Sequence, residues 1–147
     1  MDYKNITLAV IALAKETGSF FLEEINKVKT SDIEVKGIHD FVSYVDKTAE
    51  ARIVKRLAEI LPESGFITEE QTATHRGERF NWIVDPLDAT TNFLHHIPLY
   101  SVSIALMEYG EVVAGVVYEP NLDECFYAWK EGKAFLNENE IHVSDQK

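Results

Sequence analysis

Three apolar runs follow one another closely in the second half of the chain, and they constrain its fold more than any other feature. The runs are YSVSIALM (100–107), EVVAGVVYEP (111–120) and ECFYAWK (124–130), and AFLNENEIHV (134–143) follows as a tight hairpin. The turns between these runs are too short for the crossover that two parallel strands require. We therefore expect the runs to form an antiparallel sheet.

Helical spacing dominates much of the first half. Residues 3–28 carry apolar side chains at mixed helical spacing and predict one long amphipathic helix, which Gly18 weakens. Residues 47–61 place their apolar side chains on one face and predict a second helix that ends before Pro62.

Shorter segments complete the pattern. Residues 30–40 are polar, contain a glycine, and are interpreted as a loop or an irregular strand. FVSYV (41–45) alternates apolar and polar residues and predicts a strand, FITEE (66–70) predicts a short strand that turns polar, and FNWIV (80–84) predicts a buried strand. The hydrophilic segment 71–79 is expected to be a surface loop.

Together these elements predict an α+β fold in which two N-terminal helices pack on a mostly antiparallel sheet. The chain has 147 residues, of which 46% are hydrophobic, and this is enough for a single domain with a real core but hardly for two.

The charge and the cysteine count exclude several classes of protein. With 25 acidic and 14 basic residues the net charge is -11, and a nucleic-acid partner is not expected because such proteins present basic surfaces to phosphates. Cys125 is the single cysteine, so an intrachain disulfide and a cysteine-based zinc site are excluded. The apolar N-terminal stretch is interrupted by Lys15 and Glu16 and lacks the features of a signal peptide. We expect a cytoplasmic protein without a membrane span.

Acidic residues follow three of the strand-like segments. Asp46 follows FVSYV, Glu69 follows FIT, and Asp85 follows WIV with Asp88 three residues later. Carboxylates at strand ends can meet at one edge of a sheet, and such oxygen ligands suit Mg²⁺ or Mn²⁺. A pair of metal ions would need a carboxylate that bridges them, which accounts for the close spacing of Asp85 and Asp88.

The same residues also have purely structural explanations. Asp46 precedes a predicted helix, and Asp88 or Thr90 stands where a helix would begin, so each of them could be an N-cap. Glu69 and Glu70 could be a solvated acidic pair. Spacing alone leaves these alternatives open.

A longer motif favours the metal site. DPLDATTNF (85–93), with SVSIAL (101–106) behind it, resembles the inositol monophosphatase family, whose hallmark reads D-P-[LI]-D-G-T-x-N-F. FITEE resembles the Gly-Glu-Glu element of that family, and residues 36–43 with Asp46 resemble its Asp-x-Val-Thr-x-x-Asp segment. The three elements have the order and spacing of the family over nearly the whole chain.

The resemblance implies a set of metal ligands. Glu69, Asp85 and the backbone carbonyl of Leu87 would bind a first Mg²⁺, and Asp85 would bridge to a second Mg²⁺ that Asp88 also holds. Glu69 would reach a third, weakly held ion.

It also implies catalytic roles. The catalytic residues it implies are Asp46, Glu69 and Thr90, of which Thr90, supported by Asp46, would orient the attacking water. Asp88 and the amides of Ala89 and Thr90 would lie against the substrate phosphate. The activity implied is Mg²⁺-dependent hydrolysis of a small phosphomonoester, foremost inositol monophosphate, because Thr-Thr-Asn fits this branch better than the fructose-1,6-bisphosphatase or 3′-phosphoadenosine phosphatase branches.

The chain departs from the family pattern at two residues and in length. Ala89 and Thr68 stand where the family has glycine, and a methyl group at a left-handed or phosphate-contacting position is unfavourable. Family members are much longer, so the chain is expected to represent an N-terminal half, and the half that supplies a further aspartate is absent. An incomplete or non-catalytic interaction module is therefore the alternative, and we expect homodimerisation or pairing with a C-terminal half.

Overall fold

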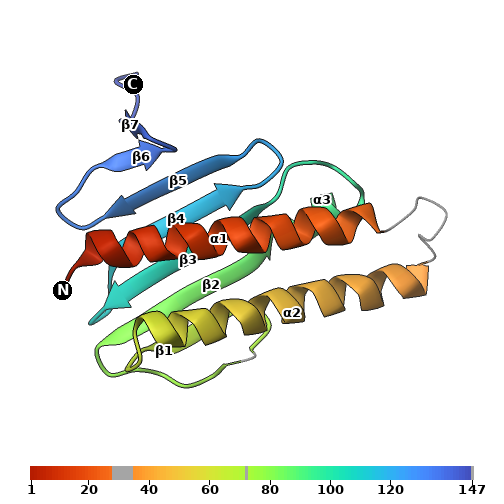
Figure 1. Cartoon of the computed structure of the whole chain (residues 1–147), viewed down its shortest axis with the longest axis horizontal. Helices are drawn as coiled ribbons and strands as arrows, with labels where there is room; N and C mark the ends of the chain where they lie inside the picture. The colour runs from red at the N-terminus through yellow and green to blue at the C-terminus, as the bar shows by residue number, and fades with distance from the viewer. Residues whose placement is uncertain (28–34, 72, 147) are drawn as a thin grey trace.

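The computed structural model of the chain describes residues 1–27, 35–71 and 73–146. Its elements, in chain order, are α1 (Tyr3–Asn26), α2 (Val35–Ile60), β1 (Gly65–Thr68), β2 (Phe80–Asp88), α3 (Thr90–Leu94), β3 (Ser101–Glu108), β4 (Glu111–Glu119), β5 (Glu124–Trp129), β6 (Ala134–Leu136) and β7 (Asn139–Ile141). Helices α1 and α2 lie side by side over one face of a single sheet (Figure 1). The predicted α+β fold is confirmed.

The sheet has seven strands in the order in which they occur along the chain. Each strand from β2 to β6 pairs antiparallel with the next, as the short connections predict. Strand β1 is the exception, because it pairs parallel to β2. The carboxyl ends of β1 and β2 therefore meet at the same edge of the sheet.

The core lies between the two long helices and the sheet. Its fully buried side chains include Phe21 from α1, Trp82 from β2 and Leu106 from β3. Gly18 is required where α1 packs on β4, since a Cβ atom there would lie 2.6 Å from the Tyr118 ring. The glycine that weakens the helix by propensity is thus the one that allows it to pack on the sheet.

The strand predicted at residues 41–45 is wrong, because α2 runs through this segment. The buried apolar side chains described on α2 recur three or four residues apart, which is the helical period, and are those of Val42, Val45, Ala49, Ile53 and Leu57. The loop or irregular strand expected at 30–40 is also wrong for residues 35–40, which are helical, and residues 30–34 lie outside the described residues. Asp46 is inside α2 and is not its N-cap.

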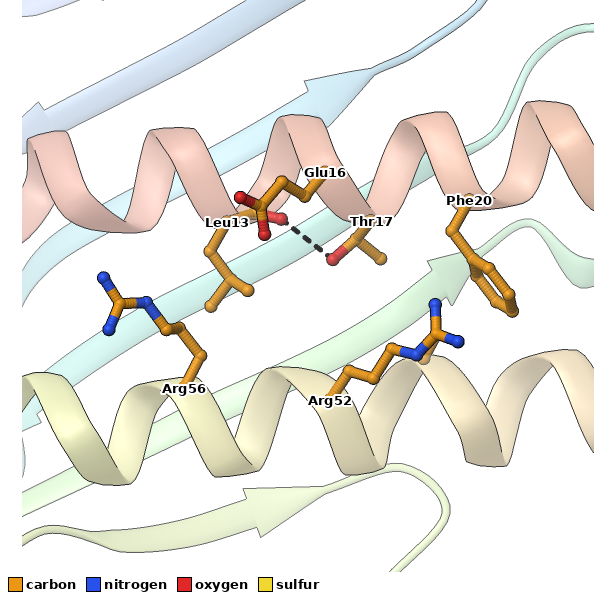
Figure 2. A pocket seen from close by; sticks show the side chains of 7 residues that line it. Leu13, Glu16, Thr17, Phe20, Arg52 and Arg56 are labelled. Carbon is orange, nitrogen blue, oxygen red and sulfur yellow. Dashed lines mark hydrogen bonds between the residues drawn. The ribbon is translucent and has the colours of Figure 1, made fainter.

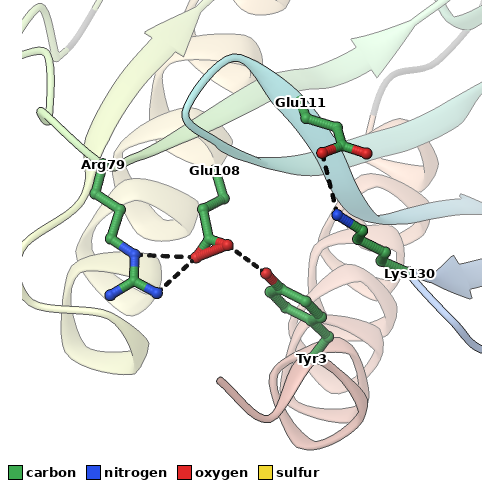
Figure 3. Close-up of polar contacts among 5 residues, drawn as sticks. All are labelled: Tyr3, Arg79, Glu108, Glu111 and Lys130. Atoms are coloured by element: carbon green, nitrogen blue, oxygen red, sulfur yellow. Dashed lines mark hydrogen bonds and ion pairs between the residues drawn. The ribbon is translucent and has the colours of Figure 1, made fainter.

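Polar contacts hold the start of α1 against the end of β3 (Figure 3). The Tyr3 hydroxyl donates to Glu108 Oε1 at 2.6 Å, and Arg79 donates to Glu108 Oε2 through Nε at 3.0 Å and Nη2 at 2.9 Å. Glu108 therefore joins α1, the end of β3 and the residue that precedes β2. A neighbouring ion pair, Lys130 with Glu111 at 3.1 Å, links β4 to the residue after β5.

Helix α1 is also long and apolar enough to cross a membrane by length and composition alone. This is weak support for a span, because the core helix of a soluble protein meets the same criteria, and 44% of the relevant stretch of α1 is buried inside the protein.

Candidate active site

The parallel pairing of β1 and β2 brings Glu69 and Asp85 together. Thr68 is paired with Val84, and the Glu69 N–H continues the ladder by donating to the Val84 carbonyl at 3.3 Å. Glu69 and Asp85 are the next residues along the two chains, so they lie side by side where β1 ends. Thr68 itself takes part in the strand, a conformation that suits a β-branched residue and does not call for glycine.

A bulge in β2 places Asp85 and Asp88 on the same face. Residues three apart in a regular strand point to opposite faces of a sheet. In β2, however, Asp85 pairs with Ser103 and Asp88 with Ser101, so three steps on one strand match two steps on the other. Because β2 carries one extra residue here, Asp85 and Asp88 point to the same face of the sheet, which is also the face of Ser101 and Ser103. Strand β2 thus runs on beyond the predicted end at residue 84.

Asp46 reaches the same cluster from α2. Its side chain is buried, and its pKa is raised to about 7, mainly because burial disfavours the charged form and further because Glu70, Asp85 and neighbouring carboxylates repel it. The pKa of Asp85 is raised to about 6, by burial first and then by Asp88 and Glu69, while the Leu87 backbone N–H opposes the shift. The predicted acidic residues therefore interact electrostatically.

Glu50 is an acidic residue of this cluster that was missed from the sequence. It lies one helical turn after Asp46 on α2, is 0% exposed, and contributes to the raised pKa values of Asp46 and Asp85. A signal was available, because Glu50 falls beside the apolar residue Ala49 on the buried face of the helix. A glutamate is almost never fully buried without a partner.

Ala89 occupies a left-handed conformation, with φ 73° and ψ 52°, at the start of the short helix α3. A methyl group at a left-handed position is unfavourable, as noted from the sequence, and Ala89 does occupy such a position. The Thr90 hydroxyl donates to the Leu87 carbonyl at 3.1 Å, and its expected pairing with Asp46 would require the side chain to rotate away from this bond. Phe93 anchors α3 in the core with no exposed surface.

The donors at this edge fit Mg²⁺ in type and charge, because they are carboxylates whose mutual repulsion a cation would relieve. Among the described residues, however, no group of three or more His, Cys, Asp or Glu side chains is close enough to hold a metal ion. The carboxylates thus form a negatively charged cluster without a closed ligand shell.

A separate hollow of about 250 Å³ lies on the helix layer, between α1 and α2 (Figure 2). Its lining includes Arg52 and Arg56, which lie one turn apart on α2. The Arg52 guanidinium stacks 4.5 Å from the centre of the Phe20 ring, and Arg56 pairs with Glu59 at 3.0 Å. None of the carboxylates described above lines this hollow, so it is distinct from the acidic cluster.

Comparison with known proteins identifies the family. The family model described as "Inositol monophosphatase family" matches residues 2–147. The chain belongs to the inositol monophosphatase family. This is a family of phosphatases, generally dependent on metal ions, and the resemblance inferred from the DPLDATTNF motif is confirmed.

Individual relatives agree with this membership. The chain is 40% identical to an inositol-1-monophosphatase of Mesorhizobium japonicum over 92% of its own length and 51% of the relative's. It is 38% identical to a fructose-1,6-bisphosphatase/inositol-1-monophosphatase of Aquifex aeolicus, over 98% of the chain and 54% of the relative. The crystal structure of the extragenic suppressor protein suhB from Bartonella henselae superposes with a TM-score of 0.83 at 36% identity, covering 97% of this chain and 55% of that one. The chain thus spans about half the length of the relatives it matches.

Proposed function

We propose that the chain provides the metal-binding and phosphate-binding part of a Mg²⁺-dependent phosphatase that hydrolyses a small phosphomonoester, foremost inositol monophosphate. The observation that carries the proposal is the β2 bulge, which turns Asp85 and Asp88 to one face beside Glu69. Family membership supports the reaction class.

Each residue has a defined task in this proposal. Glu69, Asp85, Asp88 and the Leu87 carbonyl would hold Mg²⁺, or Mn²⁺ in its place. When bound, the metal supplies a more acidic coordinated water and stabilises negative charge on the departing oxygen. Because the pKa of Asp85 is raised to about 6, its carboxyl group is ionised, and so able to act as a ligand, only once the pH rises above about that value.

Thr90, Asp46 and Ala89 would act on the water and the phosphate. The ionised Asp46 carboxylate can accept a hydrogen bond from the Thr90 hydroxyl once that hydroxyl has turned from the Leu87 carbonyl. The Thr90 oxygen then accepts a hydrogen bond from the attacking water and orients it. Asp88, Ala89 and Thr90 would lie against the substrate phosphate at the start of α3.

The relatives are about twice as long, so we propose that a further metal ligand and the contacts to the substrate's hydroxyl groups come from outside these 147 residues. The sheet face opposite α1 and α2 supports association, since Val117 is 40% exposed and Phe126 is 38% exposed on adjacent strands of that face. A homodimer, or pairing with a C-terminal half, would cover it. We also propose that the protein acts in the cytoplasm, which suits its one free cysteine.

The test is phosphate release from inositol 1-phosphate by the purified chain, with and without Mg²⁺, beside an Asp85→Asn variant. Metal-dependent release that the variant abolishes supports catalysis by this chain, and sedimentation then gives the assembly responsible. Calorimetric Mg²⁺ binding without release supports a half-built site. Absence of both release and binding overturns the proposal.

Substrate choice has a specific alternative. One relative's name combines fructose-1,6-bisphosphatase with inositol-1-monophosphatase activity, so a sugar bisphosphate belongs in the substrate panel beside a 3′-phosphoadenosine nucleotide. The ratio of kcat/KM values across the panel decides among them.

The second candidate function is a non-catalytic interaction module of the same fold. The left-handed conformation of Ala89 favours this candidate. A strained residue at the turn proposed to contact phosphate would impair an enzyme, whereas a module without turnover can tolerate it. Metal binding that persists without phosphate release, in a protein to which the C-terminal half has been restored, would favour this candidate over the enzyme.

A further inference from the structure

Glu50 is fully buried beneath the acidic cluster, and its carboxylate is hydrogen-bonded to the chain that carries Glu69. Glu50 Oε1 accepts the backbone N–H of Glu70 at 2.8 Å, which joins α2 to the turn after β1. Removing a carboxylate from water is costly, and hydrogen bonds to the charged group offset only part of that cost. An aliphatic side chain would fill the same space without the cost of burying a charge, so packing alone does not explain a glutamate here.

The hydrogen bond acts on Glu69 through the peptide that links it to Glu70. This peptide is planar, so a fixed Glu70 N–H also fixes the orientation of the Glu69 carbonyl group and restricts the Glu69 backbone. On the other side of Glu69, its own N–H donates to the Val84 carbonyl of β2 at 3.3 Å. Glu69 is exposed, yet its backbone is held by β2 before it and by α2 after it.

Other hydrogen bonds near this turn hold the chain on either side of the Glu69–Glu70 peptide. The Phe66 N–H donates to the His75 carbonyl at 2.7 Å, and the Thr68 hydroxyl donates to the Ala73 carbonyl at 3.5 Å. Without the contact to α2, the peptide itself would be held, among the described residues, by the Glu69 N–H alone. The carboxylate of Glu69 could then move relative to Asp85, although it must converge with Asp85 on one cation if the proposed function is right.

We propose that Glu50 is a positioning residue, whose buried carboxylate holds the Glu69–Glu70 peptide against α2 and thereby sets where the Glu69 carboxylate lies relative to Asp85. The inference rests on the proposed function only in that Glu69 is taken as a metal ligand. The anchoring of the turn is a property of the metal-free chain.

Two variants of Glu50 separate the hydrogen bond from the charge. Glu50→Gln retains a side-chain oxygen that can accept the Glu70 N–H but removes the negative charge. Glu50→Met keeps a similar volume and removes the acceptor. Glu24→Gln is the matched control, because Glu24 is a buried glutamate on α1 that pairs with Lys27 at 2.9 Å. Circular dichroism melts verify that each variant is folded.

The first measurement is amide hydrogen exchange at Glu70, followed by NMR in the absence of metal. Loss of a hydrogen bond to a carboxylate should accelerate exchange by roughly tenfold or more in Glu50→Met. Glu50→Gln and Glu24→Gln should stay near the wild-type rate. Equal Glu70 exchange in Glu50→Met and the wild-type chain would overturn the proposal.

The second measurement is the dissociation constant for Mg²⁺ by calorimetry. We expect Glu50→Met to weaken binding by roughly tenfold or more, and Glu50→Gln to rescue most of that loss. Equal weakening in both variants would refute positioning, because the charge and not the hydrogen bond would then matter.

The two measurements also distinguish this inference from the proposed function. A wild-type chain that binds no Mg²⁺, combined with faster Glu70 exchange in Glu50→Met, supports the anchoring and counts against the proposed metal site. A wild-type chain that binds Mg²⁺, with Glu50→Met unchanged in both measurements, supports the proposed metal site and refutes the anchoring by Glu50.

Discussion

Ala89→Gly is expected to stabilise the chain, although replacing alanine with glycine is usually destabilising. Ala89 has φ 73° and ψ 52°, where the methyl group of an L-residue crowds the backbone. The residue precedes α3, and its carbonyl accepts N–H groups of Asn92 and Phe93 at 3.0 and 3.2 Å. The first turn of α3 therefore depends on this conformation, and the side chain has no way to relieve it by moving.

Two terms decide the size of the effect. The left-handed conformation costs a residue with a Cβ roughly 1–2 kcal/mol, and glycine would remove this cost. Glycine also makes the unfolded chain more flexible, which offsets roughly 0.4–1 kcal/mol of the gain. The difference is a stabilisation of about 0.5–1 kcal/mol, which in a chain of this size corresponds to a rise in Tm of roughly 1–4 °C.

Urea unfolding followed by tryptophan fluorescence measures this difference, because Trp82 is only 1% exposed in the folded chain. Ala12→Gly is the matched control, since Ala12 is exposed in the interior of α1 and the same substitution there should destabilise by roughly 0.5–1 kcal/mol. Opposite signs at the two positions support the conformational explanation. A loss of stability in Ala89→Gly as large as in Ala12→Gly would refute it.

Three further outcomes are expected. Folding raises the pKa values of Asp46 and Asp85, so their contribution to stability is fully present below the unfolded pKa of about 4 and is lost as the pH rises to about 7. The urea midpoint of the metal-free chain should therefore be higher at about pH 5 than at about pH 8. Asp85→Asn should stabilise the metal-free chain by roughly 1 kcal/mol at about pH 8 and abolish any rise in Tm on adding Mg²⁺, whereas a retained rise would exclude Asp85 as a ligand. Gly18→Ala should destabilise by roughly 1–3 kcal/mol, because its Cβ would lie 2.6 Å from the Tyr118 ring; an unchanged thermal melt would show that α1 can shift away.

The antiparallel strands were predictable because their pairing follows from local information. Runs of alternating residues joined by short turns, such as the one at Tyr109–Gly110, leave few other arrangements. Helix α2 was only half predictable. FVSYV alternates over five residues, a window too short to separate a strand from a helix, and Gly37 signalled a break that the helix tolerates. Within FVSYV, the burial of Val42 and Val45, three residues apart, fits the helical period.

The position of Asp46 shows how a correct grouping can come from a wrong intermediate step. Asp46 was expected at the edge of the sheet because a strand was predicted before it, yet it reaches Asp85 from a helix on the covered face. The motif fixed which residues belong together, while the element that carries one of them was misassigned. Glu50 was missed for a different reason, because it lies inside the helix that was predicted over 47–61, beside Ala49 on the buried face, and its burial was not recognised.

Pro86 is the residue from which the geometry of the site could have been inferred. A proline has no N–H to donate, so within a sheet it is confined to edges, strand starts and bulges. At this point β2 is still paired with β3, although β1 ends opposite Val84, and a proline beside a paired strand favours either an end to the strand or a bulge. An end would leave Asp88 free to point anywhere. The bulge instead keeps β2 paired to Ser101 and turns two aspartates with an odd spacing to the same face, which is what two carboxylates need if they are to share a cation.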